Sequence, residues 1–428
     1  MSRLIAEPSH ATPSSRARSA VRGGLFGNFV DQVDIFLPVI ALAPAAAIVL
    51  GPDAAAAQTG LIFVATLFGR PLGAAIFGSL ADRYGRTSTT RIAIAGIALT
   101  TLLIALIPNH GVGGAATLWA FVALRFVGGI FLGGEYSAAI PLAMEWTAPR
   151  RRGLLGGGIM AMSPLANAFI AALTLVLVQV LGADAYAAWG WRMPFVAGAL
   201  LAAAMLWYYA TAVDDSPIST SSPRRPHPLR DILVGPFRRQ LWQVFVLMTG
   251  LWLFTQMAIP VLTGMLRETP QVGPTTVPSI MLIATLASAG AMLAAGAVSQ
   301  RMGRRRFFVV FGAVAIIAAP LAFAWALVSE GGGTVLAVTV VQLVTVSAYG
   351  PVGAYLAERF PAAVRSSGYG VGYSLSIVVP ALFPFWLPPL QTALGPVVAV
   401  MVMLAAASAL LVIGAALGPE PKRSAALE

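Results

Sequence analysis

The chain has 428 residues, of which 58% are hydrophobic and only 10% are charged, whereas about 25% are charged in an ordinary soluble domain. It contains no cysteine, which excludes a disulfide framework, an iron–sulfur cluster and a thiolate zinc site, and its three histidines lie outside the apolar segments, so we expect no metal site and no cofactor. The net charge of +11 comes from arginines clustered in short segments between apolar stretches, a pattern typical of the cytoplasmic loops of membrane proteins rather than of a nucleic-acid-binding surface.

Apolar segments follow one another along almost the whole chain, and each is long enough to cross a bilayer, which takes about 20 residues. We therefore predict an all-α polytopic membrane protein with twelve spans. The predicted spans are residues 24–50, 58–81, 91–108, 116–145, 154–181, 192–213, 240–265, 277–300, 307–328, 333–357, 367–390 and 395–418.

The longest polar connector divides these spans into six and six, and its Pro, Ser, Thr and Arg content is typical of a linker. Short loops rich in arginine are typical of the cytoplasmic side, so we predict that both termini are cytoplasmic. Of the positively charged residues other than the two inside the spans, only Arg192 and Arg267 are expected on the outer side of the membrane. The predicted organisation is an irregular cytoplasmic arm (1–23, with no signal peptide), a first six-helix bundle (24–213), a cytoplasmic linker (214–239), a second six-helix bundle (240–418) and a cytoplasmic tail (419–428).

Five charged residues lie inside the predicted spans, all in the first half: Asp31, Asp34, Arg70, Arg125 and Glu135. Charges at bilayer depth are costly and usually serve transport, so we expect proton coupling by the three acids and substrate binding by the two arginines. Arg125 and Glu135 are about 15 Å apart along one helix, so each needs a partner on another helix. Asp34 or Asp31 is the natural partner of Arg125.

Two of these charges have more than one interpretation. Glu135 follows Gly133 and Gly134, which allow close approach of a neighbouring helix. The carboxyl group is then removed from water, which favours its protonated form, so it can take a proton from outside and release it inside. The alternative is a static buried ion pair. Arg70 can bind a carboxylate substrate through its guanidinium fork, or it can be neutralised by Asp31 or Asp34.

A nine-residue pattern occurs in both halves. Residues 78–86 read GSLADRYGR, and residues 296–304, 218 positions later, read GAVSQRMGR. A looser pair begins at Glu145 and at Glu358. Two six-helix repeats joined by a linker are typical of transporters that move their halves around a central site.

Residues 78–86 resemble the loop motif of the major facilitator superfamily. The stretches Arg70-Pro-Leu-Gly and Gly133-Gly-Glu further resemble its metabolite:H⁺ symporter branch. The resemblance implies two pseudo-symmetric six-helix bundles and transport by alternating access. Where that branch has an acidic-Trp-Tyr-Asp run, this chain has Asp31-Gln-Val-Asp34, which keeps both acids and lacks both aromatic residues.

The resemblance also implies a latch at the cytoplasmic helix ends that stabilises the outward-facing state. A carboxylate there can accept hydrogen bonds from a helix N-terminus and pair with arginines; the alternative is ordinary loop solvation and charge that sets topology. In the second copy Gln300 replaces the acid, so it can form hydrogen bonds but no ion pair. The predicted latch residues are Asp82, Arg83, Arg86, Glu145, Arg152, Arg301, Arg304, Glu358 and Arg365.

In the second half, Gln256 and Gln342 lie near mid-span and are candidates for substrate contacts. We predict a monomeric secondary transporter of the bacterial inner membrane that couples uptake of a small carboxylated metabolite to proton entry, with protons as the only coupling ion. No nucleotide-binding loop is present, which argues against direct use of ATP. The alternatives are a proton-coupled exporter or a uniporter of the same fold and, more remotely, a polytopic membrane enzyme, for which the histidines are misplaced.

Overall fold

In this computed structural model, residues 13–51, 55–221, 225–269, 272 and 276–420 are described, and they form helices and short connections without any strand. Helices are expected in this setting, because a chain inside the bilayer must satisfy its backbone hydrogen bonds internally. Eleven helical segments are long and apolar enough to cross a membrane, and twelve if the bent pair Ala362–Ala381 and Phe383–Leu394 is one span. The predicted all-α membrane fold is thus confirmed.

The first half contains α1 (Pro13–Ile40), α2 (Ala46–Leu50), α3 (Ala55–Tyr84), α4 (Arg86–Ala105), α5 (His110–Gly113), α6 (Ala115–Glu145), α7 (Arg152–Leu181), α8 (Ala183–Ala185) and α9 (Arg192–Ala212), with short helices η1 (Ala43–Ala45), η2 (Pro149–Arg151) and η3 (Tyr186–Gly190). Helices α3 and α4 pack against α6, α9 packs against α4, and α1 packs against α6, α7 and α9.

The second half contains α12 (Arg238–Gln256), η4 (Met257–Val261), α13 (Leu262–Glu268), α14 (Val277–Met302), α15 (Arg304–Val328), α16 (Gly332–Thr345), η5 (Val346–Tyr349), α17 (Val352–Arg359), η6 (Ala362–Val364), α18 (Arg365–Leu375), α19 (Val378–Ala381), α20 (Phe383–Leu394) and α21 (Pro396–Ala416). Helix α21 packs against α12 and α15, and α16 packs against α14 and α15.

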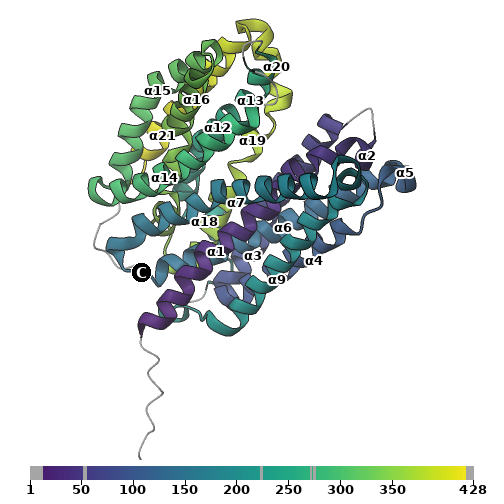
Figure 1. The fold of residues 1–428 in the computed structure, drawn as a ribbon. Coiled ribbons are helices and arrows are strands. Elements are labelled where there is room, and N and C mark those ends of the chain that lie inside the picture. The colour runs from purple at the N-terminus through teal and green to yellow at the C-terminus, as the bar shows by residue number, and fades with distance from the viewer. Residues whose placement is uncertain (1–12, 52–54, 222–224, 270–271, 273–275, 421–428) are drawn as a thin grey trace, which may run out of the picture.

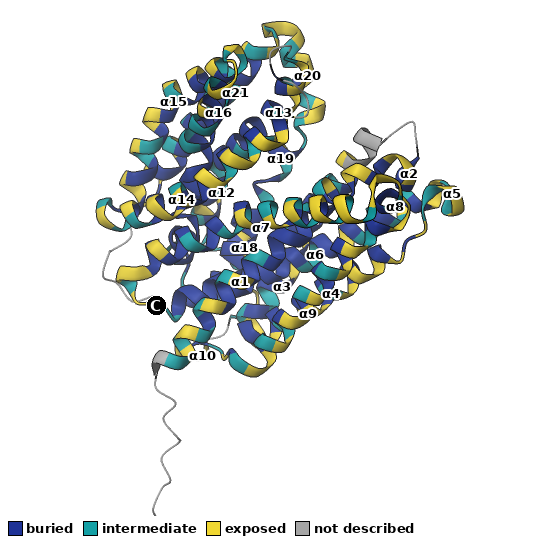
Figure 2. Cartoon of the chain, in the orientation of Figure 1, coloured by how far each residue is buried: buried dark blue, intermediate teal, exposed yellow. Residues whose placement is uncertain are grey.

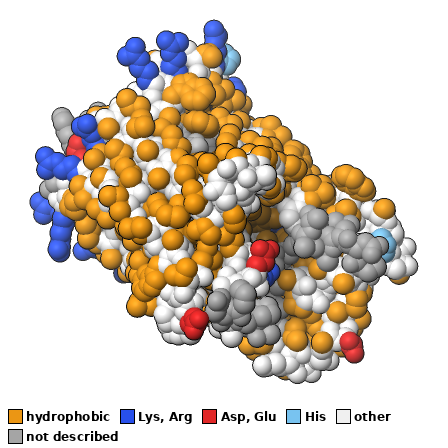
Figure 3. All heavy atoms as spheres, turned by 90° about the horizontal axis from the view of Figure 1, so that it is seen from above, with side chains coloured by type: hydrophobic (Ala, Val, Ile, Leu, Met, Phe, Trp, Pro, Cys, Tyr) orange, Lys and Arg blue, Asp and Glu red, His pale blue; other side chains and the backbone are white. Residues whose placement is uncertain are grey.

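The two halves meet through α7 against α14 and α17, and through α18 against α3 and α6. Figure 1 shows the two groups of helices close together around α14, α7 and α18 and diverging toward α5 on one side and α20 on the other. Residues where the two groups meet are mostly buried, and exposed residues lie on the outer faces (Figure 2). The exposed face in Figure 3 is dominated by hydrophobic side chains, as expected of a surface that contacts lipid.

The prediction of an irregular N-terminal arm is wrong for residues 13–23. Helix α1 begins at Pro13, so the described part of the arm, residues 13–23, is helical. The helix extends because its first turns pack on α9: Ala20 is buried, the Tyr208 hydroxyl donates to the Ser19 carbonyl at 3.1 Å, and Arg16 lies 3.5 Å from Asp214.

The linker also contains structure that its composition did not indicate. Two short helices, α10 (Pro217–Ser221) and α11 (Pro228–Leu233), lie within residues 214–239. Helix α11 contacts α3 and α18, one from each half. The linker is therefore packed against both halves through α11.

The repeated nine-residue pattern forms the same turn in both halves. Gly85 has φ +111° and precedes α4, and Gly303 has φ +103° and precedes α15. Residues with a Cβ rarely adopt such angles, so both copies need glycine to reverse the chain between two antiparallel spans.

Candidate functional site

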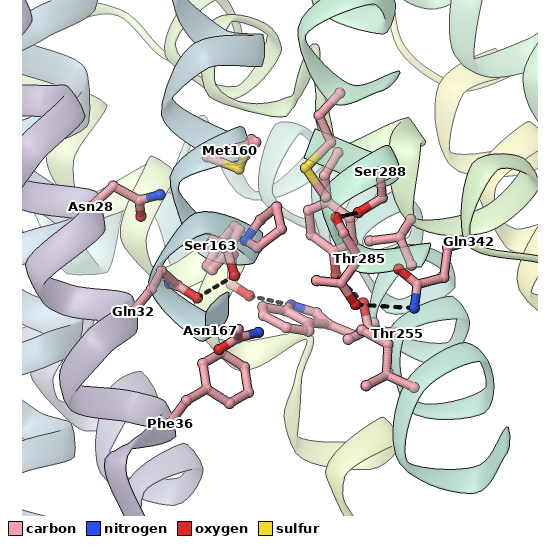
Figure 4. Close-up of a pocket in the computed structure, with 17 residues that line it drawn as sticks. Asn28, Gln32, Phe36, Met160, Ser163, Asn167, Thr255, Thr285, Ser288 and Gln342 are labelled. Atoms are coloured by element: carbon pink, nitrogen blue, oxygen red, sulfur yellow. Dashed lines mark hydrogen bonds between the residues drawn. The ribbon is translucent and has the colours of Figure 1, made fainter. Parts of the chain in front are cut away.

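A cavity lies between the halves and is bordered by α1 and α7 on one side and by α12, α14, α16 and η5 on the other. Its enclosed volume is about 90 Å³, below the roughly 300–1,000 Å³ of typical small-molecule sites, so the cavity must widen when a metabolite binds. Figure 4 shows Asn28 and Gln32 on one wall and Thr285, Ser288 and Gln342 facing them. None of the described residues that line the cavity is charged.

The lining offers hydrogen-bonding groups that are only partly satisfied. The Ser163 hydroxyl donates to Gln32 at 2.7 Å, and Gln342 donates to Thr285 at 3.2 Å. The side-chain carbonyl oxygens of Asn28, Asn167 and Gln342 are buried and accept no hydrogen bond from the described residues. Buried acceptors of this kind are normally paired, so they are available to a ligand that carries donors.

Sequence reasoning found only Gln342 among these polar residues. The others had a usable signal: they occur as pairs at helical spacing in otherwise apolar spans, which places both members on one face. The pairs are Asn28 with Gln32, Ser163 with Asn167, and Thr285 with Ser288. Gln256 is buried outside the cavity lining, with its amide 3.5 Å from the Pro380 carbonyl.

The structure places Asp34 and Arg125 in the ion pair that the sequence suggested. Arg125 donates at 2.8 Å both to the Asp34 carboxylate and to the Asp34 backbone carbonyl. It also donates to the Thr66 hydroxyl at 3.1 Å, and the Thr101 hydroxyl donates to Asp34. Both charged side chains are almost fully buried. Arg125 is therefore fully engaged with Asp34 and Thr66, and it is not among the residues that line the cavity.

Arg70 has a looser environment. Its guanidinium lies 3.7 Å from Asp31, and both side chains are buried. The guanidinium carbon also lies 5.5 Å from the ring centre of Tyr136 and 5.7 Å from that of Tyr373. Its Nε and Nη2 atoms make no hydrogen bond to the described residues. Two ring faces and one long ion pair thus hold a buried cation.

Glu135 is a buried acid whose two oxygens accept no hydrogen bond from the described residues. It faces Gly27 on α1, where a Cβ would lie 2.5 Å from its carboxylate. Glu135 interacts electrostatically with Asp31, Arg70 and Tyr209. Gly133 and Gly134 allow the close approach predicted for them, because a Cβ at Gly133 would clash with the Arg70 carbonyl on α3 and one at Gly134 with the Phe77 ring. Gly27 provides a further close approach on α1.

At the end of the molecule where the repeated turns lie, which we call the latch end, Asp82 joins the halves. Its two carboxylate oxygens accept hydrogen bonds from the backbone N–H groups of Ser366 and Ser367 at 2.9 and 2.8 Å. These donors belong to the first turn of α18, whereas Asp82 lies in the last turn of α3. A carboxylate at a helix N-terminus is the arrangement expected from the sequence.

Glu145 is the second connection at the latch end. Its buried carboxylate pairs with Arg86 from the first half and with Arg365 from the second, and it accepts a hydrogen bond from Ser216. Arg86 also donates to the Ala362 carbonyl at 3.2 Å. One carboxylate thus binds arginines from both halves.

The second copy of the motif supplies further contacts. Arg304 pairs with Glu358 at 3.1 Å and donates to Gln300 at 2.8 Å. Gln300 in turn accepts a hydrogen bond from the Gly153 N–H at 2.9 Å, which crosses from one half to the other. Gln300 therefore connects the halves by a hydrogen bond without an ion pair.

Three predicted latch residues have other surroundings. Arg152 donates at 3.2 Å to the backbone carbonyls of Met144 and Thr147 and so binds the end of its own helical hairpin. Arg83 and Arg301 are exposed. The guanidinium of Arg83 lies 5.5 Å from the ring centre of Tyr84.

Two acidic side chains that cap helices at the latch end were not predicted from the sequence. Asp215 accepts hydrogen bonds from the N–H groups of Arg86 and Thr87 at 2.9 and 2.8 Å, at the start of α4. Glu420 accepts one from the Arg306 N–H at 3.2 Å, near the start of α15. Each acid follows the last span of its half, and this equivalent position is the signal that could have identified them.

Comparison with known proteins agrees with this geometry. The sequence model described as Major Facilitator Superfamily matches residues 24–384. The chain belongs to this superfamily.

Curated relatives are transporters of small metabolites. The chain is 29% identical to the inner membrane metabolite transport protein YhjE of Escherichia coli (strain K12), with 96% of each chain covered. It is 26% identical to the alpha-ketoglutarate permease of the same strain over 74% of each chain. It is 25% identical to the ectoine/proline transporter ProP of Corynebacterium glutamicum, covering 88% of this chain and 78% of that one.

Solved structures share the fold. The proton:xylose symporter XylE, bound to 6-bromo-6-deoxy-D-glucose, matches with a TM-score of 0.78 at 18% identity, covering 96% of this chain and 98% of that one. A partially occluded inward-open form of XylE from E. coli gives a TM-score of 0.67 at the same identity, covering 94% and 97%. This chain is thus a multi-pass membrane transporter of small molecules, and the alternative of a membrane enzyme is set aside.

Proposed function

We propose that this protein is a proton-coupled symporter that takes up a small carboxylated metabolite across the bacterial inner membrane by alternating access. The observation that carries the proposal is the buried carboxylate of Glu135, which has no hydrogen bond from the described residues. A buried acid without compensation is costly to keep charged, so Glu135 is suited to bind a proton and release it when its surroundings change.

The acids divide the work in this proposal. Asp34 is held by Arg125 and Thr101 and serves as the fixed partner of Arg125. Glu135 carries the proton, and Asp31 with Arg70 lies within its electrostatic reach. Protonation of Glu135 therefore changes the charge balance around Arg70 without breaking the Asp34–Arg125 pair.

The carboxylate on the substrate is proposed from two observations. One is Arg70, whose Nε and Nη2 atoms make no hydrogen bond to the described residues and whose neighbour Tyr373 lines the cavity. The other is the relatives: one is named an alpha-ketoglutarate permease and another an ectoine/proline transporter. The amide and hydroxyl groups of the cavity would bind the remainder of such a metabolite.

Alternating access is supported by the contacts between the halves. Asp82, Glu145 and Gln300 each join the two halves at the latch end. With the latch end cytoplasmic, this closed arrangement corresponds to an outward-facing transporter, and opening requires these contacts to break. We propose that each six-helix half moves largely as a unit, with residues 214–239 as the connection, and that a monomer suffices.

Orientation can be tested directly because the chain has no cysteine of its own. In the proposed topology Asp184 lies outside and Arg225 lies in the cytoplasm. A cysteine at position 184 should react with an impermeant maleimide on intact cells, and a cysteine at position 225 should react only after permeabilisation. The reverse pattern would place both termini outside.

Transport is tested in proteoliposomes that contain the purified wild-type protein. A thermal-shift screen of carboxylates, zwitterions and sugars first identifies a ligand, which is then used in radiolabelled form for the transport assay. An inwardly directed proton gradient should then drive accumulation above equilibrium. Accumulation only with an outwardly directed driving force would indicate an exporter, and equilibration that ignores the gradient would indicate a uniporter.

A further inference from the structure

Tyr373 connects the cavity with the buried charges of the first half. Its ring lines the cavity and is only 4% exposed. It stacks on Tyr136 with ring centres 4.1 Å apart and meets Trp252 edge to face at 5.1 Å. The Trp252 indole N–H donates to the Tyr373 backbone carbonyl at 3.0 Å, which fixes its place on α18.

The same ring covers a cation from the opposite half. The guanidinium carbon of Arg70 lies 5.7 Å from the Tyr373 ring centre. Arg70, Asp31 and Tyr136 lie on α3, α1 and α6 of the first half, whereas Tyr373 lies on α18 of the second. The contact between Arg70 and Tyr373 therefore exists only while the halves are closed at this level.

We infer that Tyr373 is a positioning residue that links the protonation state of the acids beside Arg70 to substrate in the cavity and to closure of the halves. This inference rests on the proposed proton symport, and it names the residue through which coupling acts. Its basis is that one side chain touches the cavity, the buried cation and the boundary between the halves.

The direction of the effect follows from the charge balance. While its acidic neighbours are ionised, Arg70 is attracted toward Asp31, which lies 3.7 Å away. When an acid is protonated, the buried cation loses part of this attraction and depends more on the tyrosine faces, whose attraction is strongest in a desolvated site. Protonation thus strengthens the contact with Tyr373 and favours the closed arrangement seen here, in which the latch end is sealed.

The charged and titratable groups around Asp31 come from every helix that faces it. They are Asp34 on its own helix α1, Arg70 on α3, Arg125, Glu135 and Tyr136 on α6, Tyr209 on α9 beside Glu135, and Tyr373 on α18, with Tyr369 on α18 beside Glu135 and Arg70. Asp34 and Arg125 compensate each other. Glu135 and Asp31 are therefore the acids whose protonation changes the balance at Arg70.

Substrate acts on the other side of the same ring. A molecule in the cavity contacts Tyr373 and its neighbour Trp252, and a shift of the ring away from Arg70 removes the contact that holds the halves together. A proton alone thus keeps the transporter closed at the latch end, and proton plus substrate allows it to open. Such a device prevents proton leakage in the absence of substrate.

The test measures conformation without substrate, by spin labels on cysteines introduced at Val112 and Val328. Both positions are highly exposed and lie in opposite halves at the end away from the latch. Double electron–electron resonance in nanodiscs between pH 8 and pH 5 should show that the population with the longer distance rises at low pH, about tenfold relative to the shorter-distance population, the size expected of a desolvated cation–π contact.

Variants then locate the effect. Tyr373→Phe keeps the ring and should keep the pH response, whereas Tyr373→Leu should abolish it; Tyr373→Met gives the same test if the leucine variant does not fold. Tyr369→Leu is the matched control, because Tyr369 packs on Tyr136 one turn away but does not line the cavity. A full response in Tyr373→Leu or Tyr373→Met overturns the inference and leaves symport intact, whereas no response in the wild type contradicts proton coupling itself.

Discussion

Replacing Asp82 by Asn tests the latch most sharply. The carboxylate accepts two backbone hydrogen bonds, from Ser366 at 2.9 Å and Ser367 at 2.8 Å. The amide keeps one acceptor and turns an NH₂ group toward the other N–H. The loss of one hydrogen bond to a charged group costs about 1.5–3 kcal/mol, and the lost charge at a helix N-terminus adds about 0.3–1 kcal/mol.

The expected result is that the closed arrangement loses about 2–4 kcal/mol relative to the open one, so its population ratio falls roughly 30-fold or more. Spin labels at Val112 and Val328 report this ratio at fixed pH. Substrate affinity should stay within a few-fold, because Asp82 is remote from the cavity. Turnover should slow as the outward-facing state becomes scarce.

Asp215→Asn provides the matched control. Asp215 makes the same kind of contact, to the N–H groups of Arg86 and Thr87, but within one half. It should lower the melting temperature without shifting the distance populations. If Asp82→Asn and Asp215→Asn both lower stability and neither changes the populations, Asp82 is only a helix cap and the latch reasoning fails.

Two further changes test the packing and the buried charge of the first half. Gly73→Ala would place a Cβ against the backbone carbonyl of Ile130 at an impossibly short distance, so α3 and α6 must separate and the melting temperature should fall markedly, whereas Gly60→Ala meets no atom within 4 Å and should be neutral; equal melting temperatures would refute the tight α3–α6 contact. Asp34→Asn leaves the buried Arg125 uncompensated, at a cost of about 3–5 kcal/mol, so folded yield in size-exclusion chromatography should be poor, and adding Arg125→Met should restore it, since removing both charges is often neutral; a normal yield of the single variant would show that the pair is not needed.

Much of the fold could be predicted from the sequence because it follows from local composition. The length of each apolar segment defines a span, and the repeated GSLADRYGR-type pattern defines the two equivalent turns at Gly85 and Gly303. The pairing of Asp34 with Arg125 was also within reach, because a buried charge needs a partner and few were available. The contact of Asp82 with a helix N-terminus was expected instead from the resemblance of residues 78–86 to the loop motif of the superfamily.

The remaining features depend on how helices are rotated and placed against one another. Nothing in the sequence around Arg70 indicates that two tyrosine rings cover it, one of them from the other half. Nor does the linker composition reveal that Asp215 caps α4. The uncharged lining of the cavity, with Asn28 and Asn167, was not predicted. We expected the buried arginines to bind substrate, whereas ion pairs with buried acids hold them outside the cavity lining.

The central claim, proton coupling through Glu135, is tested most directly by one pair of transport measurements on Glu135→Gln in proteoliposomes. We predict that an inward proton gradient drives no accumulation of labelled substrate in this variant, while counterflow exchange of the same substrate continues, because exchange needs no net proton movement. Accumulation at the wild-type level in Glu135→Gln would contradict the account and leave Asp31 and Asp34 as the candidates among the buried acids of the first half.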